Sequence, residues 1–305
     1  MGPSRVAVAS TVPRRTPARA VAGAEALLAA GIWASSFVGV KAALAHTGPL
    51  TVAGLRYTLA FLLLLPLLGR GRGALPAGAW PRLALIGIAQ YTVGNGALFW
   101  SLRTLSAAAG SLSLSLVPIV VLLLQIVWLR ERPSGVALLG LALTVGGSVL
   151  FFLPTVEAGD AAALGALAVA ILAFAVLPVV GRELARAGSV GTVPLTAIPL
   201  GIGGGILLGG ALAWEGVPEL PLAMWGVIVG LAVVNTALAY LVYNHALRHL
   251  TAVEANVILN LSPLGTALLA WVTLGETLSP LRLVAMAIVL LGAGMVQGRR
   301  GGGGR

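Results

Sequence analysis

The residues that could do chemistry in this chain are two cations and a set of amides and phenols placed inside long apolar stretches. They are Lys41, Arg56, Gln90, Asn95, Asn235, Tyr240, Asn244, Asn256 and Asn260. Charged and amide groups are expensive to place in lipid, so such residues are treated as functional candidates. We predict that they contact a small molecule, the two cations attracting a carboxylate or another anionic group and the amides and phenols orienting the rest.

A plainer interpretation exists for each group. Lys41 and Arg56 lie toward the ends of their apolar stretches and could snorkel to lipid headgroups along their aliphatic stems. The amides could simply bond one helix to another, which contributes about 0.6 kcal/mol on average. The residues alone leave both alternatives open.

Several kinds of chemistry lack the residues they require. The apolar stretches hold no paired acids, no His-Glu-x-x-His zinc motif and no Ser with His, so we expect no catalytic residues and no enzyme. With no cysteine, thiolate metal sites and disulfides are excluded, and we expect neither a metal nor a cofactor. The basic residues that give the net charge of +10 are not interleaved with aromatic residues, so we expect no nucleic-acid partner.

Composition assigns the chain to the membrane. It is 58% hydrophobic and 9% charged, whereas soluble proteins average about 25% charged residues. Apolar runs of about 20 residues cross a bilayer as helices. We predict an all-α integral membrane protein with ten transmembrane helices, at about 24–45, 50–69, 83–102, 107–129, 134–153, 161–181, 190–214, 222–246, 252–274 and 279–297.

The basic residues predict the orientation. If the N-terminus is cytoplasmic, fifteen of the nineteen Lys and Arg residues lie inside and four lie toward the outside. This asymmetry places both termini in the cytoplasm of a multi-pass protein in the cell (inner) membrane. Residues 1–23 and 298–305 are predicted to be disordered basic tails.

The chain also repeats itself. Residues 75–150 are matched without a gap by 220–295, 145 positions later, including shared Pro, Glu, Arg and Trp positions. Ten helices divide into five per copy, so the second copy must enter the membrane from the opposite side. We therefore predict two inverted five-helix repeats, 24–153 and 161–297, an arrangement typical of carriers that alternate access between two sides.

Two pairs of equivalent residues are given structural roles. Pro118 and Pro263 are predicted to kink the fourth and ninth helices near the bilayer centre. Glu131 and Glu276 each stand in a short link and are predicted to brace the start of the next helix through its backbone N–H groups.

Several segments resemble the EamA family of the drug/metabolite transporter superfamily. The resemblance is carried by residues 33–41 (WASSFVGVK), by 55–60 (LRYTLA) and by the Leu102–Ala107, Pro118 and Gly140–Gly147 pattern, and it covers about residues 24–297. Ala34 and Ser36 depart from the Gly and Asn that are usual in the first motif. The resemblance implies a carrier of a small organic metabolite, amino acid-like or another small solute, with net efflux, acting as a monomer in the lipid bilayer. The alternatives are a non-transporting membrane scaffold and an exporter of drugs or organic cations.

Overall fold

A computed structural model describes residues 17–69, 75–105, 114, 116–130, 133–152, 161–188, 190–262, 264–265 and 279–298, and every regular element among them is helical. The elements are α1 (Pro17–Leu44), α2 (Pro49–Gly69), α3 (Ala79–Ile86), η1 (Gly87–Asn95), α4 (Gly96–Ser101), α6 (Val117–Trp128), α7 (Gly135–Phe152), α8 (Ala161–Phe174), α9 (Val176–Ala187), α10 (Thr192–Trp214), α11 (Leu222–Ala232), η3 (Val233–Leu238), α12 (Ala239–Ala246), α13 (Ala252–Leu259) and α15 (Pro280–Gly298). Two of them, η1 and η3, are π-helical.

Within the described residues, five helical segments are long and apolar enough to cross a bilayer. They are Pro49–Gly69, Ala79–Ser101, Ala161–Ala187, Thr192–Trp214 and Leu222–Ala246, and shorter apolar helices accompany them. Large apolar side chains face outward along these helices, as Leu62 and Leu63 do on α2 and Leu290 and Leu291 do on α15. An outer surface of this kind is stable against lipid tails and would be a liability in water.

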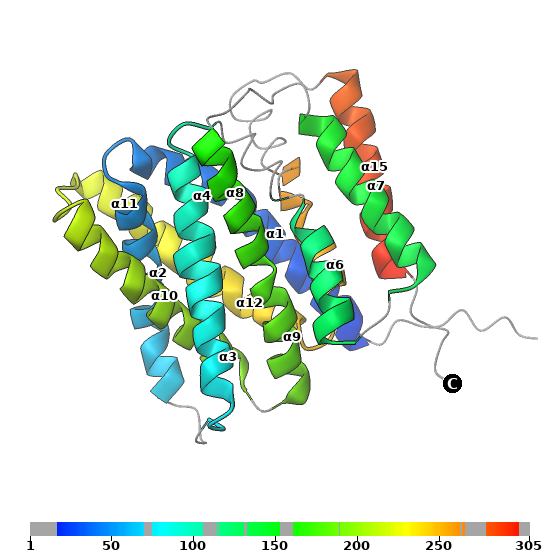
Figure 1. Ribbon diagram of the computed structural model, residues 1–305, viewed down its shortest axis with the longest axis horizontal. Helices are drawn as coiled ribbons and strands as arrows, with labels where there is room; N and C mark the ends of the chain where they lie inside the picture. The colour runs from blue at the N-terminus through cyan, green and yellow to red at the C-terminus, as the bar shows by residue number, and fades with distance from the viewer. Residues whose placement is uncertain are drawn as a thin grey trace, which may run out of the picture.

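Two helix pairs form the most extensive contacts, α2 with α10 and α7 with α15. Figure 1 shows these pairs at opposite ends of the molecule. Each pair meets at glycines, because the missing side chain lets two backbones approach. A Cβ at Gly204 would come within 2.8 Å of the backbone nitrogen of Thr58, and one at Gly54 within 2.7 Å of the backbone of Leu208.

The contact between α7 and α15 is reciprocal. Gly147 lies against Val289, and Gly292 lies against Thr144. Under the 145-residue offset, Gly292 is the counterpart of Gly147 and Val289 is the counterpart of Thr144. Each copy therefore presents the same two positions to the other, which is the contact pattern of a two-fold axis.

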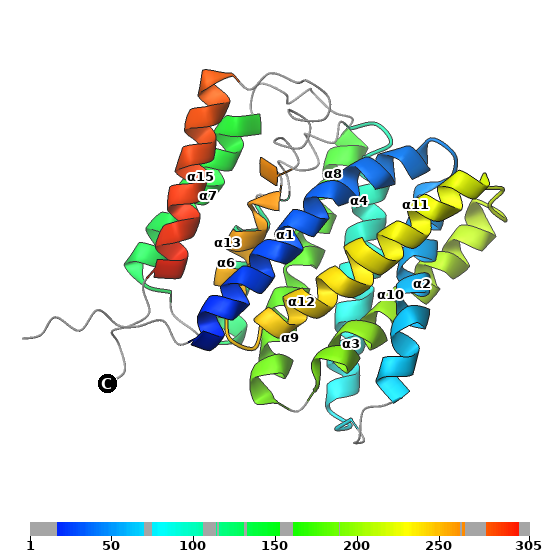
Figure 2. The same cartoon turned by 180° about the vertical axis from the view of Figure 1, so that it is seen from behind.

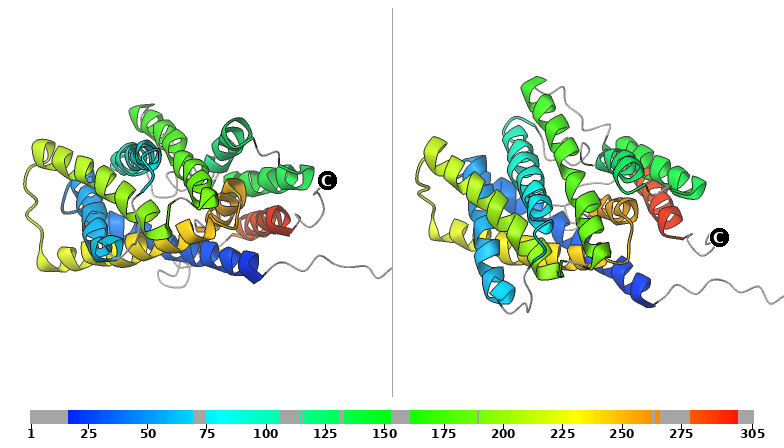
Figure 3. Two further views of the ribbon diagram at one scale, coloured as in Figure 1. Left: turned by 90° about the horizontal axis from the view of Figure 1, so that it is seen from below. Right: turned by 60° about the horizontal axis from the view of Figure 1, so that its bottom comes forward.

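The remaining helices lie on two sides of the molecule. Figure 2 shows α1 running alongside α11 and α12 on one side, and Figure 3 shows α3, α4 and α8 on the opposite side. The π-helical segments interrupt two equivalent spans, α3–η1–α4 and α11–η3–α12. A π-turn holds one residue more than an α-turn, so side chains beyond it change direction, and such segments often occur at functional sites.

An ion pair and a histidine–carboxylate contact join α1 to the second copy of the repeat at one end of the molecule. Arg19 Nη2 lies 2.7 Å from Glu254 Oε1, and the ring nitrogen Nδ1 of His245 lies 2.8 Å from the Glu25 carboxylate. Glu254 also completes a capping box with Thr251 at the start of α13. These contacts hold the N-terminal part of α1 against α12 and α13.

Candidate functional site

A cavity of about 170 Å³ lies between the helices and is lined from both copies of the repeat. Its polar lining residues are Ser36, Arg56, Gln90, Asn95, Asn256, Asn260 and Ser262. Six of the candidates predicted from sequence are therefore brought together here: Arg56, Gln90, Asn95, Tyr240, Asn256 and Asn260. No acidic residue is among the described residues that line the cavity.

Arg56 is the one cation among the described lining residues, and its side chain is buried, with only 4% of the residue exposed. Its Nε donates to Thr236 Oγ1 at 2.6 Å, Nη1 to Ser36 Oγ at 2.7 Å and Nη2 to the carbonyl of Asn235 at 2.9 Å. All three acceptors are neutral, and within the described residues no carboxylate forms an ion pair with the guanidinium. Arg56 is thus turned into the protein, and the headgroup-directed orientation considered from the sequence is not observed.

The two π-helical segments place the amides. Asn95 Nδ2 donates to the carbonyl of Gln90, five residues back, at 2.8 Å. The Thr236 hydroxyl makes the same five-residue contact with the carbonyl of Leu231 at 2.8 Å. A polar side chain in each π-segment therefore satisfies a carbonyl of its own helix, which stabilises the local irregularity.

Gln90 reaches across the cavity from η1. Its Nε2 donates to the hydroxyl of Tyr240 on α12 at 3.2 Å, which joins equivalent spans of the two copies. Its Oε1 is buried and has no hydrogen-bond partner within the described residues. A buried acceptor without a partner is unfavourable by about 1–3 kcal/mol, so it is a candidate contact for a ligand.

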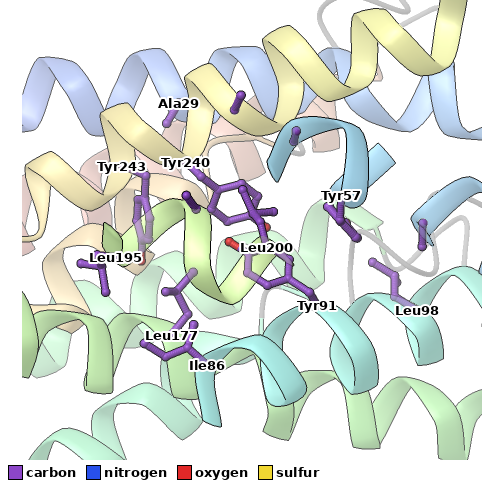
Figure 4. Close-up of a cluster of buried hydrophobic side chains, with 14 of the residues drawn as sticks. Ala29, Tyr57, Ile86, Tyr91, Leu98, Leu177, Leu195, Leu200, Tyr240 and Tyr243 are labelled. Carbon is purple, nitrogen blue, oxygen red and sulfur yellow. The ribbon is translucent and has the colours of Figure 1, made fainter. Parts of the chain in front are cut away.

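Aromatic side chains form a continuous cluster beside these amides. The ring centroids of Trp33 and Tyr240 are 4.8 Å apart, those of Tyr240 and Tyr91 are 5.2 Å apart, and those of Tyr91 and Tyr57 are 5.1 Å apart. The pairs are tilted or edge-to-face, the arrangement that aromatic quadrupoles favour. Figure 4 shows Tyr240 and Tyr91 at the centre of this cluster, with Tyr57 and Tyr243 on either side.

Asn256 and Asn260 come from α13 and its C-terminal end. Both residues are buried, at 6% and 5% exposure, and they lie four positions apart, so they share one helix face. Asn260 is the C-cap residue of the helix. Together with Ser262, they form the polar wall of the cavity that the second copy contributes.

Two candidates do not line the cavity. Asn235 Nδ2 donates to the carbonyl of Ile32 at 2.6 Å and to Ser35 Oγ at 3.0 Å, so its side chain ties η3 to α1. The main-chain carbonyl of Asn235 nevertheless accepts a hydrogen bond from Arg56. Asn244 donates to Thr196 Oγ1 at 3.0 Å and ties α12 to α10.

The other predicted residues contribute less to the observed geometry. Lys41 lies in α1, and its side chain falls outside the described part of the chain, as do Glu131, Pro263 and Glu276 in full. Pro118 is the second residue of α6, where a missing backbone N–H breaks no helical hydrogen bond. Since most of residues 106–115, together with Glu131, Pro263 and Glu276, lie outside the described part, the predicted kinks and braces stay predictions.

Sequence reasoning overlooked the apolar and aromatic part of the lining. Trp33, Ser36 and Val40 all face the cavity from α1. Their spacing of three and four residues marks one helix face, and this signal was available in the sequence. Phe99 and Phe174 carried no such signal, because a lone Phe in an apolar span is indistinguishable from a lipid-facing one.

The apolar spans, the outward-facing leucines and a cavity between helices with polar groups in its lining define the class, a multi-pass membrane protein with an internal cavity. The model of the EamA-like transporter family matches residues 24–153 and again 161–297. The chain belongs to this family of transporters.

Relatives agree with this membership. The chain is 27% identical over 244 residues to an uncharacterized transporter of Archaeoglobus fulgidus, covering 80% of this chain and 84% of the relative. It is 26% identical to an S-adenosylmethionine/S-adenosylhomocysteine transporter of Chlamydia trachomatis, covering 88% and 86%. A WAT1-related chloroplastic protein of Arabidopsis thaliana is 26% identical, with 85% of this chain and 65% of the relative covered.

A solved crystal structure has the same fold. It superposes with a TM-score of 0.77 at 18% sequence identity, and the superposition covers 91% of this chain and 97% of the chain in the solved structure. At that identity the likeness concerns the arrangement of the helices and carries no information about the ligand.

Proposed function

We propose that the protein is a carrier that moves a small organic solute across the cell (inner) membrane by alternating access between two inverted five-helix repeats. The observation that carries the proposal is the cavity, which is lined by polar residues of both copies and joined across them by the bond between Gln90 and Tyr240. A site at the interface between repeats becomes accessible from one side or the other when the repeats rock.

The architecture behind the proposal has ten helices, repeats at 24–153 and 161–297, and both termini in the cytoplasm. The reciprocal contact of Gly147 and Gly292 supports the pseudo-two-fold relation between the copies. Because the chain lacks cysteine, single cysteines report topology directly. A cysteine at Pro218 should react with an impermeant maleimide from outside and one at Ser134 only from inside, and the opposite pattern contradicts the orientation.

The solute is proposed to carry an anionic group that meets Arg56. Among the described residues the Arg56 guanidinium has only neutral hydrogen-bond acceptors, so an anionic group of the solute would supply its counter-charge. Asn260 and Tyr240, which line the cavity, orient the rest of the molecule, while the main-chain carbonyl of Asn235 holds Arg56 in place. Lys41, on the same helix as the lining residue Val40, is proposed to attract the same anion toward the entrance.

The same observation weighs against an exporter of organic cations. Such a carrier is expected to hold a carboxylate in its site, and the described lining has a cation and no acid. Net export and action as a monomer complete the proposal, and both are open to measurement.

The test uses purified protein in sealed liposomes. Candidate solutes are identified by comparing metabolites inside and outside cells with and without the protein. The flux of these labelled solutes into the liposomes should be saturable. A non-transporting scaffold gives no flux. Arg56→Met should weaken the uptake of anionic solutes about tenfold or more, since a charge-assisted hydrogen bond is lost. Arg103→Met, at an exposed arginine, is the matched control and should transport normally.

Arg56→Lys separates charge from structure. It keeps the charge and loses the three-way bonding, so anion uptake should fall less than in Arg56→Met when the folded fraction is equalised. If Arg56→Met takes up anionic solutes as well as the wild type does, and neutral solutes likewise, the anionic site is contradicted. The carrier function is unaffected by that result.

A further inference from the structure

The described lining of the cavity is enriched in aromatic residues. Aromatic residues make up 6% of the chain, yet six of the twenty lining residues are aromatic: Trp33, Tyr57, Phe99, Phe174, Tyr240 and Tyr243. The chain has four tyrosines in all, and every one of them belongs to the ring cluster around Trp33 and Tyr240. Apolar packing against lipid or against other helices does not require a phenol hydroxyl. The placement of the tyrosines therefore indicates a role at the cavity.

The rings do not form a plain apolar wall. Trp33 meets Tyr240 at an interplanar angle of 61° and Tyr243 at 60°, so neighbouring rings turn faces and edges in different directions. A flat aromatic ligand can continue such a series with favourable edge-to-face or offset contacts, whereas an aliphatic ligand of the same size gains only apolar burial.

Two polar features complete the recognition pattern. Arg56 supplies a positive charge, and the described lining offers no acid to compete for it. Gln90 Oε1 is an acceptor on the cavity wall with no hydrogen-bond partner in the described part of the chain, on a residue that is 8% exposed. In the structure Gln90 Nε2 donates to the Tyr240 hydroxyl, and Gln90 Oε1 is left as an acceptor that a donor group of a ligand can satisfy.

We propose that the cavity binds a planar aromatic or heteroaromatic anion that also carries an N–H or O–H donor, and that Gln90 is a specificity-determining residue that selects for the donor. The proposal rests on the proposed function for the location of the site, and it adds the class of the ligand. Arg56 binds the anionic group, the ring cluster around Trp33 packs on the planar part, and Gln90 Oε1 accepts the donor.

Four probes at neutral pH separate these requirements: 4-hydroxybenzoate, benzoate, 4-hydroxycyclohexanecarboxylate and 4-hydroxybenzamide. Binding to the full-length protein in lipid nanodiscs is measured by calorimetry or by displacement, without any need for flux. The wild-type protein should bind 4-hydroxybenzoate about tenfold more tightly than the cyclohexane analogue, which lacks the ring. It should also bind it about tenfold more tightly than the neutral amide or the donor-free benzoate.

Variants assign each preference to its residue. Gln90→Leu should abolish the preference for 4-hydroxybenzoate over benzoate, and a ratio of two ligands on one variant is insensitive to the folded fraction. Trp33→Leu should reduce the preference for the ring over the cyclohexane analogue, while Trp33→Phe should retain most of it. Trp80→Leu is the matched control, because Trp80 is 51% exposed and lies outside the cavity lining.

The proposal is overturned if wild-type protein binds the cyclohexane analogue as tightly as 4-hydroxybenzoate, if benzoate and 4-hydroxybenzoate bind equally, or if no probe binds at millimolar concentration. Flux in sealed liposomes separates this result from failure of the carrier function. Selective binding without any flux supports the ligand class and contradicts the carrier, whereas flux of other solutes without ring preference contradicts only the ligand class.

Discussion

Replacement of Glu215 should weaken the attachment between α10 and α2 without touching the cavity. Glu215 caps the end of α10, and its carboxylate accepts from the backbone N–H groups of Leu50 at 3.0 Å and Thr51 at 2.8 Å and from the Thr51 hydroxyl at 2.7 Å. Pro49 has no N–H, and Val52 donates to the carbonyl of Gly48 at 3.1 Å. One carboxylate thus satisfies the N–H groups of α2 that have no other partner.

The magnitude follows from these contacts. Loss of an N-terminal cap costs about 0.5–2 kcal/mol, and loss of a negative charge at the positive end of a helix costs about 0.3–1 kcal/mol. Because Glu215 is half-buried, we expect Glu215→Ala to lower the free energy of unfolding by about 2 kcal/mol. Glu215→Gln keeps one acceptor oxygen and should lose about half of that.

Thermal unfolding in detergent, followed by tryptophan fluorescence, is a suitable assay. The Tm of Glu215→Ala should fall by roughly 4 °C. Glu219→Ala provides the control, since Glu219 is an exposed acid on the same connection and should leave the Tm within about 1 °C. If Glu215→Ala and Glu219→Ala have the same Tm, the Glu215 carboxylate does not cap α2 and the reasoning is refuted.

Three other predictions concern packing and polar links between helices. Gly203→Ala places a methyl group against the backbone of η1 and should destabilise the protein by about 1–3 kcal/mol in the same melting assay, whereas Gly205→Ala, with nothing within 4 Å, should be neutral or slightly stabilising. Arg19→Ala leaves the buried Glu254 carboxylate without its cation and should destabilise by about 1–3 kcal/mol; a double-mutant cycle with Glu254→Gln then measures their coupling, and a coupling of zero contradicts the ion pair. Asn244→Ala should lower stability by about 1 kcal/mol with unchanged probe affinity, since Asn244 bonds α10 rather than lining the cavity, and a selective loss of affinity contradicts this assignment.

The helical class, the membrane setting and the family could be predicted from the sequence, because each depends on properties that repeat along the chain. Hydropathy runs and the 145-residue offset need no tertiary information. Six of the nine candidate contacts also line the cavity, since a polar side chain in an apolar span has few stable locations other than the interior.

The remaining features of the site depend on how the helices pack and could not be predicted from the sequence. Nothing local distinguishes Asn244, which bonds Thr196, from Asn95, which lines the cavity, because both are buried amides in spans. Whether Arg56 turned outward or inward was decided by Thr236 and Ser36, residues that are distant in sequence and supply its acceptors. The π-helical segments depend on hydrogen bonds that no periodicity of side chains reveals.

The two π-helical segments have a consequence for insertions and deletions. Removal of one residue from an α-helix rotates everything beyond it by about 100°, which normally turns a buried face outward. Within η1 or η3 the turn already holds a surplus residue, so a one-residue deletion can relax to regular α-helix with the two flanking helices still continuous. The same deletion rotates Gln90 and Tyr240 relative to each other. Single-residue deletions in these two spans therefore offer a way to change what the cavity accepts while the membrane-spanning scaffold survives.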